Sequence, residues 1–224
     1  MKISTNEKET FPIDTAVEMI KAKSQEKQRK FVESVDIAVN LNIDAKQSNQ
    51  NIRGSVSLPA GSGKDVRVIV FTDNDSLAEE ALKAGAVKAG LTNLIADIDN
   101  GFLDFDYCIA TPNVMKSLSK IAKKLGPRGL MPNPKLGNIT DDVIAVLNQA
   151  KKGKVNLKND KAGIVHACAG KINFTNEDLV SNIKAIVNTI KELKPESVKG
   201  KYVKSIYLST TMGPSVAVKL DGLL

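Results

Sequence analysis

The sequence predicts a mixed α/β (α+β) protein with two domains. One is an antiparallel α+β domain made from both chain ends, and the other is a doubly wound α/β domain inserted between them. Strands near the ends alternate apolar and polar positions, whereas those in the middle are short, almost wholly apolar and separated by helical patterns. Glycine-containing linkers stand where the two styles meet. The predicted boundaries are 1–61 with 154–224 for the split domain and 62–153 for the insertion.

The first strand pattern belongs to a sheet with one buried face. Large apolar side chains occupy every second position of residues 35–44, and the segments 52–58 and 202–208 repeat this style. Residues 154–157 and 164–167 return to it after the middle of the chain. Such alternation is typical of antiparallel sheets with one face packed on a core.

The second strand pattern belongs to a sheet buried on both faces. Residues 66–71 and 107–110 are nearly continuous apolar runs, which favours a parallel sheet. Helices are predicted at 76–83 and at 92–98, where Thr92 is a candidate N-cap.

Three further helices follow. The first has an apolar stripe ended by Gly126, and the second covers 140–153. The third is long and amphipathic, with Thr175 and Asp178 in capping-box spacing and Pro195 as its stop. In the helix that ends at Gly126, the apolar stripe consists of Val114, Leu118, Ile121 and Leu125.

The charge distribution points to a polyanionic partner. The chain has 224 residues, a formal net charge of +7 and a pI near 9.3. Residues 116–135 carry six cations and no acid, and residues 151–161 carry five lysines and only Asp160. Residues 73–106 reverse the balance, with eight acids against two lysines. Segregated charge suggests one surface for phosphate, although scattered lysines on an ordinary soluble protein would give the same total.

Membrane insertion and secretion are not expected. No apolar run approaches the roughly 20 residues that span a bilayer. Residues 1–8 lack the apolar core of a secretory signal. Cys108 and Cys168 lie in apolar contexts, so buried thiols in a cytoplasmic protein are expected in preference to a disulfide.

Catalytic motifs are missing from the sequence. The single histidine, His166, lies in an apolar run without a Cys/His cluster of metal-ligand spacing, so a structural or RNA-facing role is favoured over catalysis. The Gly-Ser-Gly-Lys segment at 61–64 is not a phosphate loop, because Leu58 replaces its first glycine and Asp65 its hydroxyl residue. We therefore predict a protein that is not an enzyme and has neither a cofactor nor a metal.

Two segments and one aromatic residue allow a binding role. Residues 125–135 combine prolines, glycines and cations with apolar groups expected to be exposed, which suits either a rigid contact loop or a stiff connection. Residues 209–214 offer hydroxyls and a glycine to ribose, or form an ordinary turn. Phe31 suits the core or RNA stacking. Because only 4% of residues are aromatic, a single-strand stacking platform is not expected.

At these residues the chain resembles the family of universal large-subunit ribosomal protein one. The matching motifs run through nearly the whole chain in family order, at 30–35, 50–59, 126–135, 159–161 and 209–213. The resemblance implies a split domain with an inserted Rossmann-like domain, and a cytoplasmic protein on the ribosome. It also implies binding to large-subunit ribosomal RNA at the mobile stalk near the tRNA exit site, contact with exit-site tRNA and other ribosomal components, assistance in release of deacylated tRNA, and repression of translation through the protein's own messenger RNA.

The resemblance places the RNA surface on the split domain. The lysines would meet phosphates, the carboxylate a base or hydroxyl, and the hydroxyl side chains ribose, while the phenyl and thioether groups pack and the glycine allows close approach. The arginine is a weaker candidate, and Ala162 replaces a hydroxyl residue of some members. The predicted residues are Lys30, Phe31, Arg53, Asp160, Lys161, Ser205, Thr211, Met212 and Gly213.

Two other functions remain open. A nucleotide-using enzyme would need a phosphate loop after Phe71, where the sequence supplies two acids and no glycine. A general basic nucleic-acid chaperone would bind RNA without regard to its fold.

Overall fold

The chain folds into two compact units. The computed structural model describes residues 9–26, 29–198 and 200–220, so the prediction about a secretory signal at 1–8 lies outside the described residues. The terminal unit comprises Met1–Gly63 and Val155–Leu224, and the inserted unit comprises Lys64–Lys154. The predicted fold class is confirmed, because one sheet is built from both chain ends and a parallel sheet is inserted between its parts. Among the described residues, no helix is long and apolar enough to cross a bilayer.

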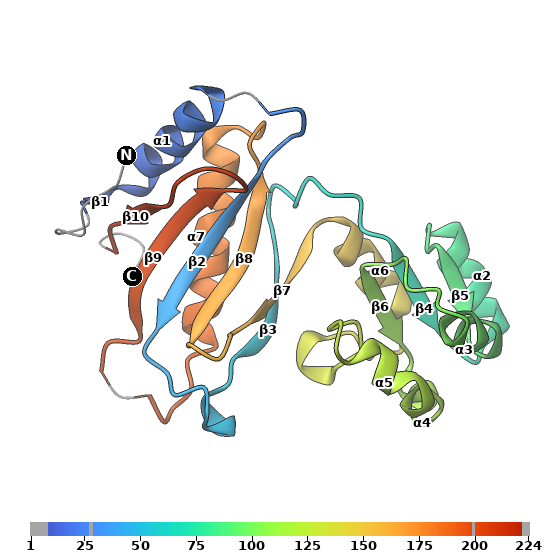
Figure 1. Cartoon of the computed structure of the whole chain (residues 1–224). Coiled ribbons are helices and arrows are strands. Elements are labelled where there is room, and N and C mark those ends of the chain that lie inside the picture. Colours follow the sequence, from blue (N-terminus) through green and yellow to red (C-terminus); the bar gives the residue numbers. More distant parts are fainter. Residues whose placement is uncertain (1–8, 27–28, 199, 221–224) are drawn as a thin grey trace. The chain divides into compact units, whose positions relative to one another are not determined.

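The terminal unit is organised around a five-stranded sheet of order β1-β10-β9-β2-β8, antiparallel except that β1 runs parallel to β10 (Figure 1). A two-stranded sheet joins β3 to β7. The strands are β1 (Thr10–Phe11), β2 (Ser34–Leu41), β3 (Arg53–Ser57), β7 (Lys154–Lys158), β8 (Ile164–Lys171), β9 (Val203–Thr210) and β10 (Val216–Val218). The helices are α1 (Ile13–Glu26) and α7 (Asn176–Glu192).

One face of this sheet is the core of the terminal unit. The alternating apolar residues of β2 are buried and pack with side chains of α1 and α7, and Figure 1 shows α7 running along one face of the strands. The predicted capping residue is confirmed, since the Thr175 hydroxyl accepts a hydrogen bond from the Asp178 amide at 3.1 Å. Helix α1 was not predicted from the sequence. Within the described part of the terminal unit, no helix packs on the opposite face of the sheet, which carries half-buried and exposed polar side chains.

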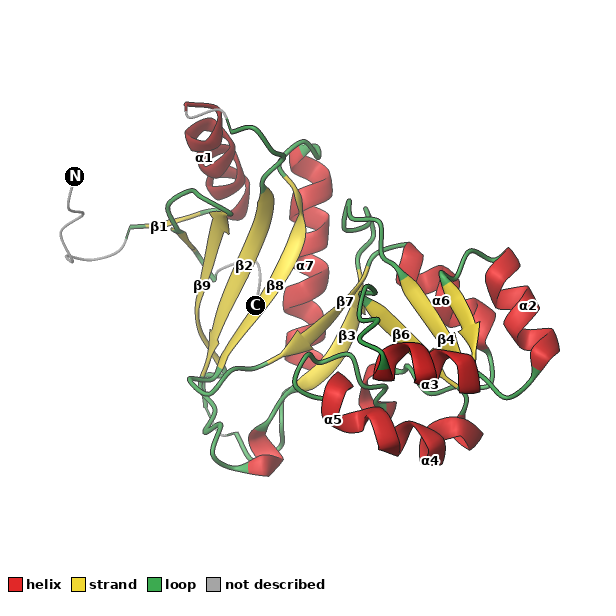
Figure 2. Cartoon of the chain, turned by 45° about the vertical axis from the view of Figure 1, so that its right-hand side comes forward, coloured by secondary structure: helices red, strands yellow, loops and turns green. Residues whose placement is uncertain are grey.

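The inserted unit is a three-layer α/β structure. Its parallel strands β4 (Val68–Phe71), β5 (Lys88–Gly90) and β6 (Tyr107–Ala110) follow the order β5-β4-β6. Alternate residues of β4 and β6 enter two separate cores, so this sheet is buried on both faces as predicted. Figure 2 shows the helices around these strands. They are α2 (Asp75–Lys83), α3 (Thr92–Asp99), α4 (Met115–Leu118), α5 (Ala122–Leu125) and α6 (Val143–Lys151).

Several local predictions for the inserted unit are wrong. Thr92 is the first residue of α3 and forms no side-chain cap. The expected helix at 140–153 begins only at Val143, because Asp142 provides the cap. Leu130 and Met131, expected to be exposed, pack against the core because the chain folds back after α5, with the Leu130 amide bonded to the Leu125 carbonyl at 3.1 Å.

Both cysteines are free thiols, as expected. Cys108 is buried, and burial raises the pKa of its thiol. Cys168, also expected to be buried, is only half-buried because it lies on the polar face of the sheet, opposite Asp36.

Candidate RNA interface

The face of the terminal sheet opposite its core is a polar surface formed by three neighbouring strands. Asp36, on β2, lies between Cys168 on β8 and Ser209 on β9. Further along, His166 and Tyr207 flank Ala38. Partial burial raises the pKa of Asp36. Because these side chains come from the non-core positions of each strand, the alternation predicted from the sequence also defines this face.

Five of the predicted residues lie at one end of this sheet, where β2 begins and β9 ends. This group is called the Thr211 cluster and consists of Lys30, Phe31, Thr211, Met212 and Gly213. Phe31 and Met212 are 53% and 60% exposed, so neither belongs to the core. Lys30 is also exposed. An aromatic ring, a thioether and a cation are thus exposed to solvent at the same end of the sheet.

Hydrogen bonds attach the turn after β9 to the first residue of β2. The Thr211 hydroxyl accepts from the Ser34 amide at 3.0 Å, and the Thr211 amide donates to the Ser34 carbonyl at 3.1 Å. The Gly213 amide donates to the Thr210 carbonyl at 3.2 Å. A Cβ atom at Gly213 would lie 2.3 Å from the Thr210 hydroxyl, so glycine is required here by packing within the turn. Part of the hydrogen-bonding capacity of Thr211 is therefore used inside the protein.

Glu33 is a residue of this region that the sequence analysis missed. It is 3% exposed and its carboxylate accepts a hydrogen bond from the Met212 amide at 3.2 Å. The hydroxyl of Thr210 beside it, the Met212 amide, the Ser24 hydroxyl and the charge of Arg29 hold the pKa of Glu33 below its ordinary value, against the opposing effect of burial. The position of this acidic residue, directly before the alternating pattern of β2, was the sequence feature that could have indicated it.

Three more predicted residues, Arg53, Asp160 and Lys161, lie at the other end of β2. Together with Lys158 and Asn159, which line the same pocket, they are called the Asp160 cluster. The Asp160 carboxylate accepts hydrogen bonds from the amides of Ala162 and Ile164, each at 2.8 Å. The Ile164 amide contributes most to lowering the pKa of Asp160. The other oxygen of the Asp160 carboxylate, Oδ2, lies 3.8 Å from Nε2 of His166. Asp160 therefore builds the turn before β8 and also faces the polar surface.

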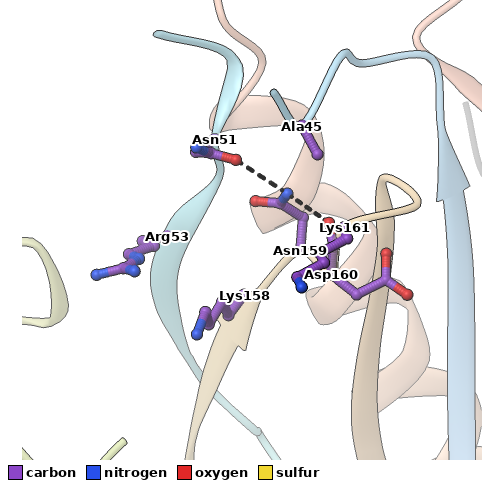
Figure 3. Close-up of a pocket in the computed structure, with 7 residues that line it drawn as sticks. All are labelled: Ala45, Asn51, Arg53, Lys158, Asn159, Asp160 and Lys161. Atoms are coloured by element: carbon purple, nitrogen blue, oxygen red, sulfur yellow. Dashed lines mark hydrogen bonds between the residues drawn. The ribbon is translucent and has the colours of Figure 1, made fainter. Parts of the chain in front are cut away.

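The buried amide of Asn159 shapes the pocket of about 480 Å³ at this cluster. The Asn159 side chain accepts from the Ile52 amide at 2.7 Å and donates to the Asn51 side chain at 3.2 Å. Figure 3 shows Arg53 and Lys158 pointing to the same side from neighbouring strands, whereas the Asp160 carboxylate points away from them. Lys158 was not among the predicted site residues, although it lies in the basic stretch 151–161.

The last predicted residue, Ser205, lies between the ends of β9 and faces β2. Its hydroxyl accepts a hydrogen bond from the Asn40 side chain at 2.8 Å. The structure thus places Lys30 and Phe31 in the segment just before β2, whose first residue bonds to Thr211, and it brings Arg53 to the pocket of Asp160. It does not form a single compact site. The eight residues of β2 separate the two clusters, which corresponds to about 23 Å at the usual rise along a strand.

This arrangement suits an extended partner with many phosphates and hydroxyls. Exposed cations lie at both ends, with Lys30 at one and Arg53, Lys158 and Lys161 at the other. Hydroxyl, amide and imidazole groups line the face between them. Folded RNA offers phosphates, ribose hydroxyls and base faces over such a length. Among the described residues, no cluster of three or more His, Cys, Asp or Glu side chains could hold a metal ion.

Comparison with known proteins gives a consistent result. The model of the ribosomal protein L1p/L10e family matches residues 20–214. The chain belongs to this family. Proteins named large ribosomal subunit protein uL1 from Coxiella burnetii and Dechloromonas aromatica are 46% and 51% identical over 209 and 189 residues. Those alignments cover 93% and 84% of this chain, and 88% and 81% of the relatives. The protein of that name from Ruthia magnifica is 43% identical over 223 residues, covering 100% of this chain and 94% of the relative.

Membership of the L1p/L10e family confirms the resemblance found in the sequence. It also confirms that the chain is a ribosomal protein and not an enzyme. The span matched by the family model contains all nine predicted site residues. Their individual contacts with RNA stay predictions.

Proposed function

We propose that the chain is a constituent of the large ribosomal subunit and binds large-subunit ribosomal RNA through the terminal unit. The names of its relatives support a place in that subunit, with other ribosomal components as neighbours. One observation carries the choice of surface: Phe31 and Met212 are both exposed at the end of the polar sheet face where Ser34 bonds to Thr211.

In this proposal the two ends of the polar face make different kinds of contact with RNA. At the Thr211 cluster, Phe31 and Met212 pack on bases or sugars, and hydroxyls meet ribose. At the Asp160 cluster, Arg53, Lys158 and Lys161 neutralise phosphates. His166, opposite Ala38, contacts the RNA between the two ends, and Ser205, opposite Asn40, contacts it near the Asp160 cluster. The rigid turns at both clusters reduce the entropy lost when RNA binds.

We extend the proposal to the mobile stalk beside the tRNA exit site. The inserted unit exposes Lys116, Lys120, Lys123 and Arg128, which suit the phosphates of an exit-site tRNA during release of deacylated tRNA. The protein also represses translation by binding its own messenger RNA through the terminal unit. If one surface serves both RNAs, the messenger and the ribosomal stem compete for it.

Filter binding at several salt concentrations tests this proposal. The intact protein is titrated with the large-subunit stalk stem and with a scrambled RNA of equal length. We expect the stem to bind at least about 10³-fold more tightly, in the range of specific recognition. Unlabelled leader of the protein's own messenger should displace the stem. Equal affinity for both RNAs with a steep salt slope would indicate a general basic chaperone and would contradict the proposal.

A further inference from the structure

Glu33 is an acidic residue whose side chain is buried. Within residues 9–26, 29–198 and 200–220, it is the only acid among the buried side chains. It lies between the exposed Phe31 and Val32 and the first residue of β2. Burying a carboxylate is costly unless hydrogen bonds and charges compensate it, so its partners show what it does.

Those partners converge on the turn after β9. One carboxylate oxygen, Oε2, accepts from the Met212 amide at 3.2 Å. The other, Oε1, accepts from the Ser24 hydroxyl at 3.3 Å and lies 3.8 Å from Nε of Arg29. The carboxylate therefore links the end of α1 to the middle of the turn.

The backbone around Glu33 strengthens this link. The Glu33 carbonyl accepts from the Ile172 amide at 3.0 Å, just beyond β8. The following residue, Ser34, exchanges hydrogen bonds with Thr211. The end of α1, the residue after β8 and the turn after β9 thus meet at Glu33. The turn after β9 is held by the Glu33 carboxylate.

A hydrogen bond to an ionised acceptor is stronger and more directional than one between neutral groups. The peptide plane before Met212 is therefore fixed by the carboxylate. This plane sets the directions of the Thr211 and Met212 side chains on either side of it. With the Met212 amide already occupied, these side chains, rather than that amide, are the groups left for RNA.

We infer that Glu33 is a positioning residue for RNA binding, whose carboxylate orients the turn at 211–213 without touching RNA itself. This inference rests on the proposed function, because it assigns a cause to the geometry of the Thr211 cluster. It predicts that both the charge and the length of the side chain matter.

Two variants separate charge from length. Glu33→Gln keeps the length but loses the charge, and its amide group would face Ser24 and Arg29 with donors. Glu33→Asp keeps the charge but is one methylene too short to reach Met212. We expect each to weaken binding of the stalk stem about tenfold, mainly through faster dissociation. Thr175→Ala is the control, because it removes the cap of α7 and destabilises the same unit away from the polar face. It should leave the affinity unchanged.

The amide of Met212 gives a second measurement, on the unaltered protein and on the variants. In the unaltered protein it should exchange slowly with solvent. In folded Glu33→Gln, verified by circular dichroism, it should exchange faster and shift in the nitrogen–proton spectrum. Fast exchange in the unaltered protein would overturn the inference even if a variant failed to fold.

The proposed function can be separated from the inference by Met212→Asp, which places a charge on the exposed surface itself. If Met212→Asp abolishes stem binding while both Glu33 variants bind normally, the RNA surface stands and the positioning role is wrong. If neither Met212→Asp nor the Glu33 variants affect binding, the RNA surface has been assigned to the wrong place.

Discussion

At the scale of single residues, exposed apolar groups distinguish the Thr211 cluster. Phe31, Val32 and Met212 are all at least half exposed, and all three lie where β2 begins and β9 ends. Single exposed apolar residues are ordinary on protein surfaces. Three at one end of a polar sheet face, beside Lys30 and hydroxyls, indicate a contact surface.

Replacing these side chains should affect binding and not folding. We expect Phe31→Ser to weaken binding of the stalk stem by roughly 5-fold to 150-fold, since a base stacked on an aromatic side chain contributes about 1–3 kcal/mol. Met212→Ser should also weaken it, because it removes apolar contact area. The free energy of unfolding should change by less than about 0.5 kcal/mol, because both side chains are exposed. Filter binding and urea denaturation measure the two quantities.

The inserted unit supplies the control for this prediction. Leu82 and Val87 are 47% and 46% exposed and lie on that unit. Leu82→Ser and Val87→Ser should leave stem affinity unchanged. Equal losses from both pairs of substitutions would mean that exposed apolar area in general, and not the Thr211 cluster, drives association.

The lowered pKa of Glu33 predicts how the free energy of unfolding depends on pH. Its pKa is lowered from the ordinary value of 4.5, so its ionised form favours the folded state. That stabilisation is complete above the ordinary pKa and is lost as pH falls through the lowered one. Glu33→Gln should therefore reduce the free energy of unfolding at pH 7, and the difference from the unaltered protein should shrink below about pH 4. Urea denaturation at pH 7, 5 and 3.5 measures this. A constant difference would contradict an ionised, stabilising Glu33.

At the scale of elements, helix α7 anchors the chain where it leaves the terminal unit. Asn182 is fully buried on this helix. Its side chain accepts from the Ala60 amide at 3.0 Å and donates to the carbonyls of Gly61 at 3.0 Å and Ala169 at 2.7 Å. One amide side chain thus holds the linker after β3 against strand β8.

Loss of this anchor should be costly. Asn182→Ala leaves buried backbone groups without partners, so we expect the terminal unit to lose about 2–4 kcal/mol of unfolding free energy. Asn188 lies on the same helix but is exposed, so Asn188→Ala should change stability by less than about 0.5 kcal/mol. Urea denaturation compares the two. Similar small effects would show that the three hydrogen bonds do not hold the linker.

At the scale of the whole molecule, strand character could be predicted from sequence far better than contacts could. The alternation at 35–44 distinguished the sheet buried on one face from the sheet of β4, which is buried on both. This was possible because the number of buried faces determines the spacing of apolar residues along a strand. Helix α1 was missed because its apolar positions become clear only against the sheet that covers them. The buried state of Glu33 depends on residues about 180 positions away, and no local pattern carries such information.

The candidate site shows the same limit. The nine predicted residues came from the family resemblance, but their distribution along β2 follows from the antiparallel pairing of β2 with β8 and β9. The roles of Asp160 and Gly213 within their own turns were not predicted, since both depend on backbone geometry.

The central claim is that RNA binds the polar face of the terminal unit from the Thr211 cluster to the Asp160 cluster. Its most direct test is a nitrogen–proton spectrum of the intact protein titrated with the stalk stem. We expect the amide shifts to concentrate at residues 30–36, 158–166 and 205–213, with α7 little affected. Shifts confined to the inserted unit, Lys64–Lys154, would contradict the account.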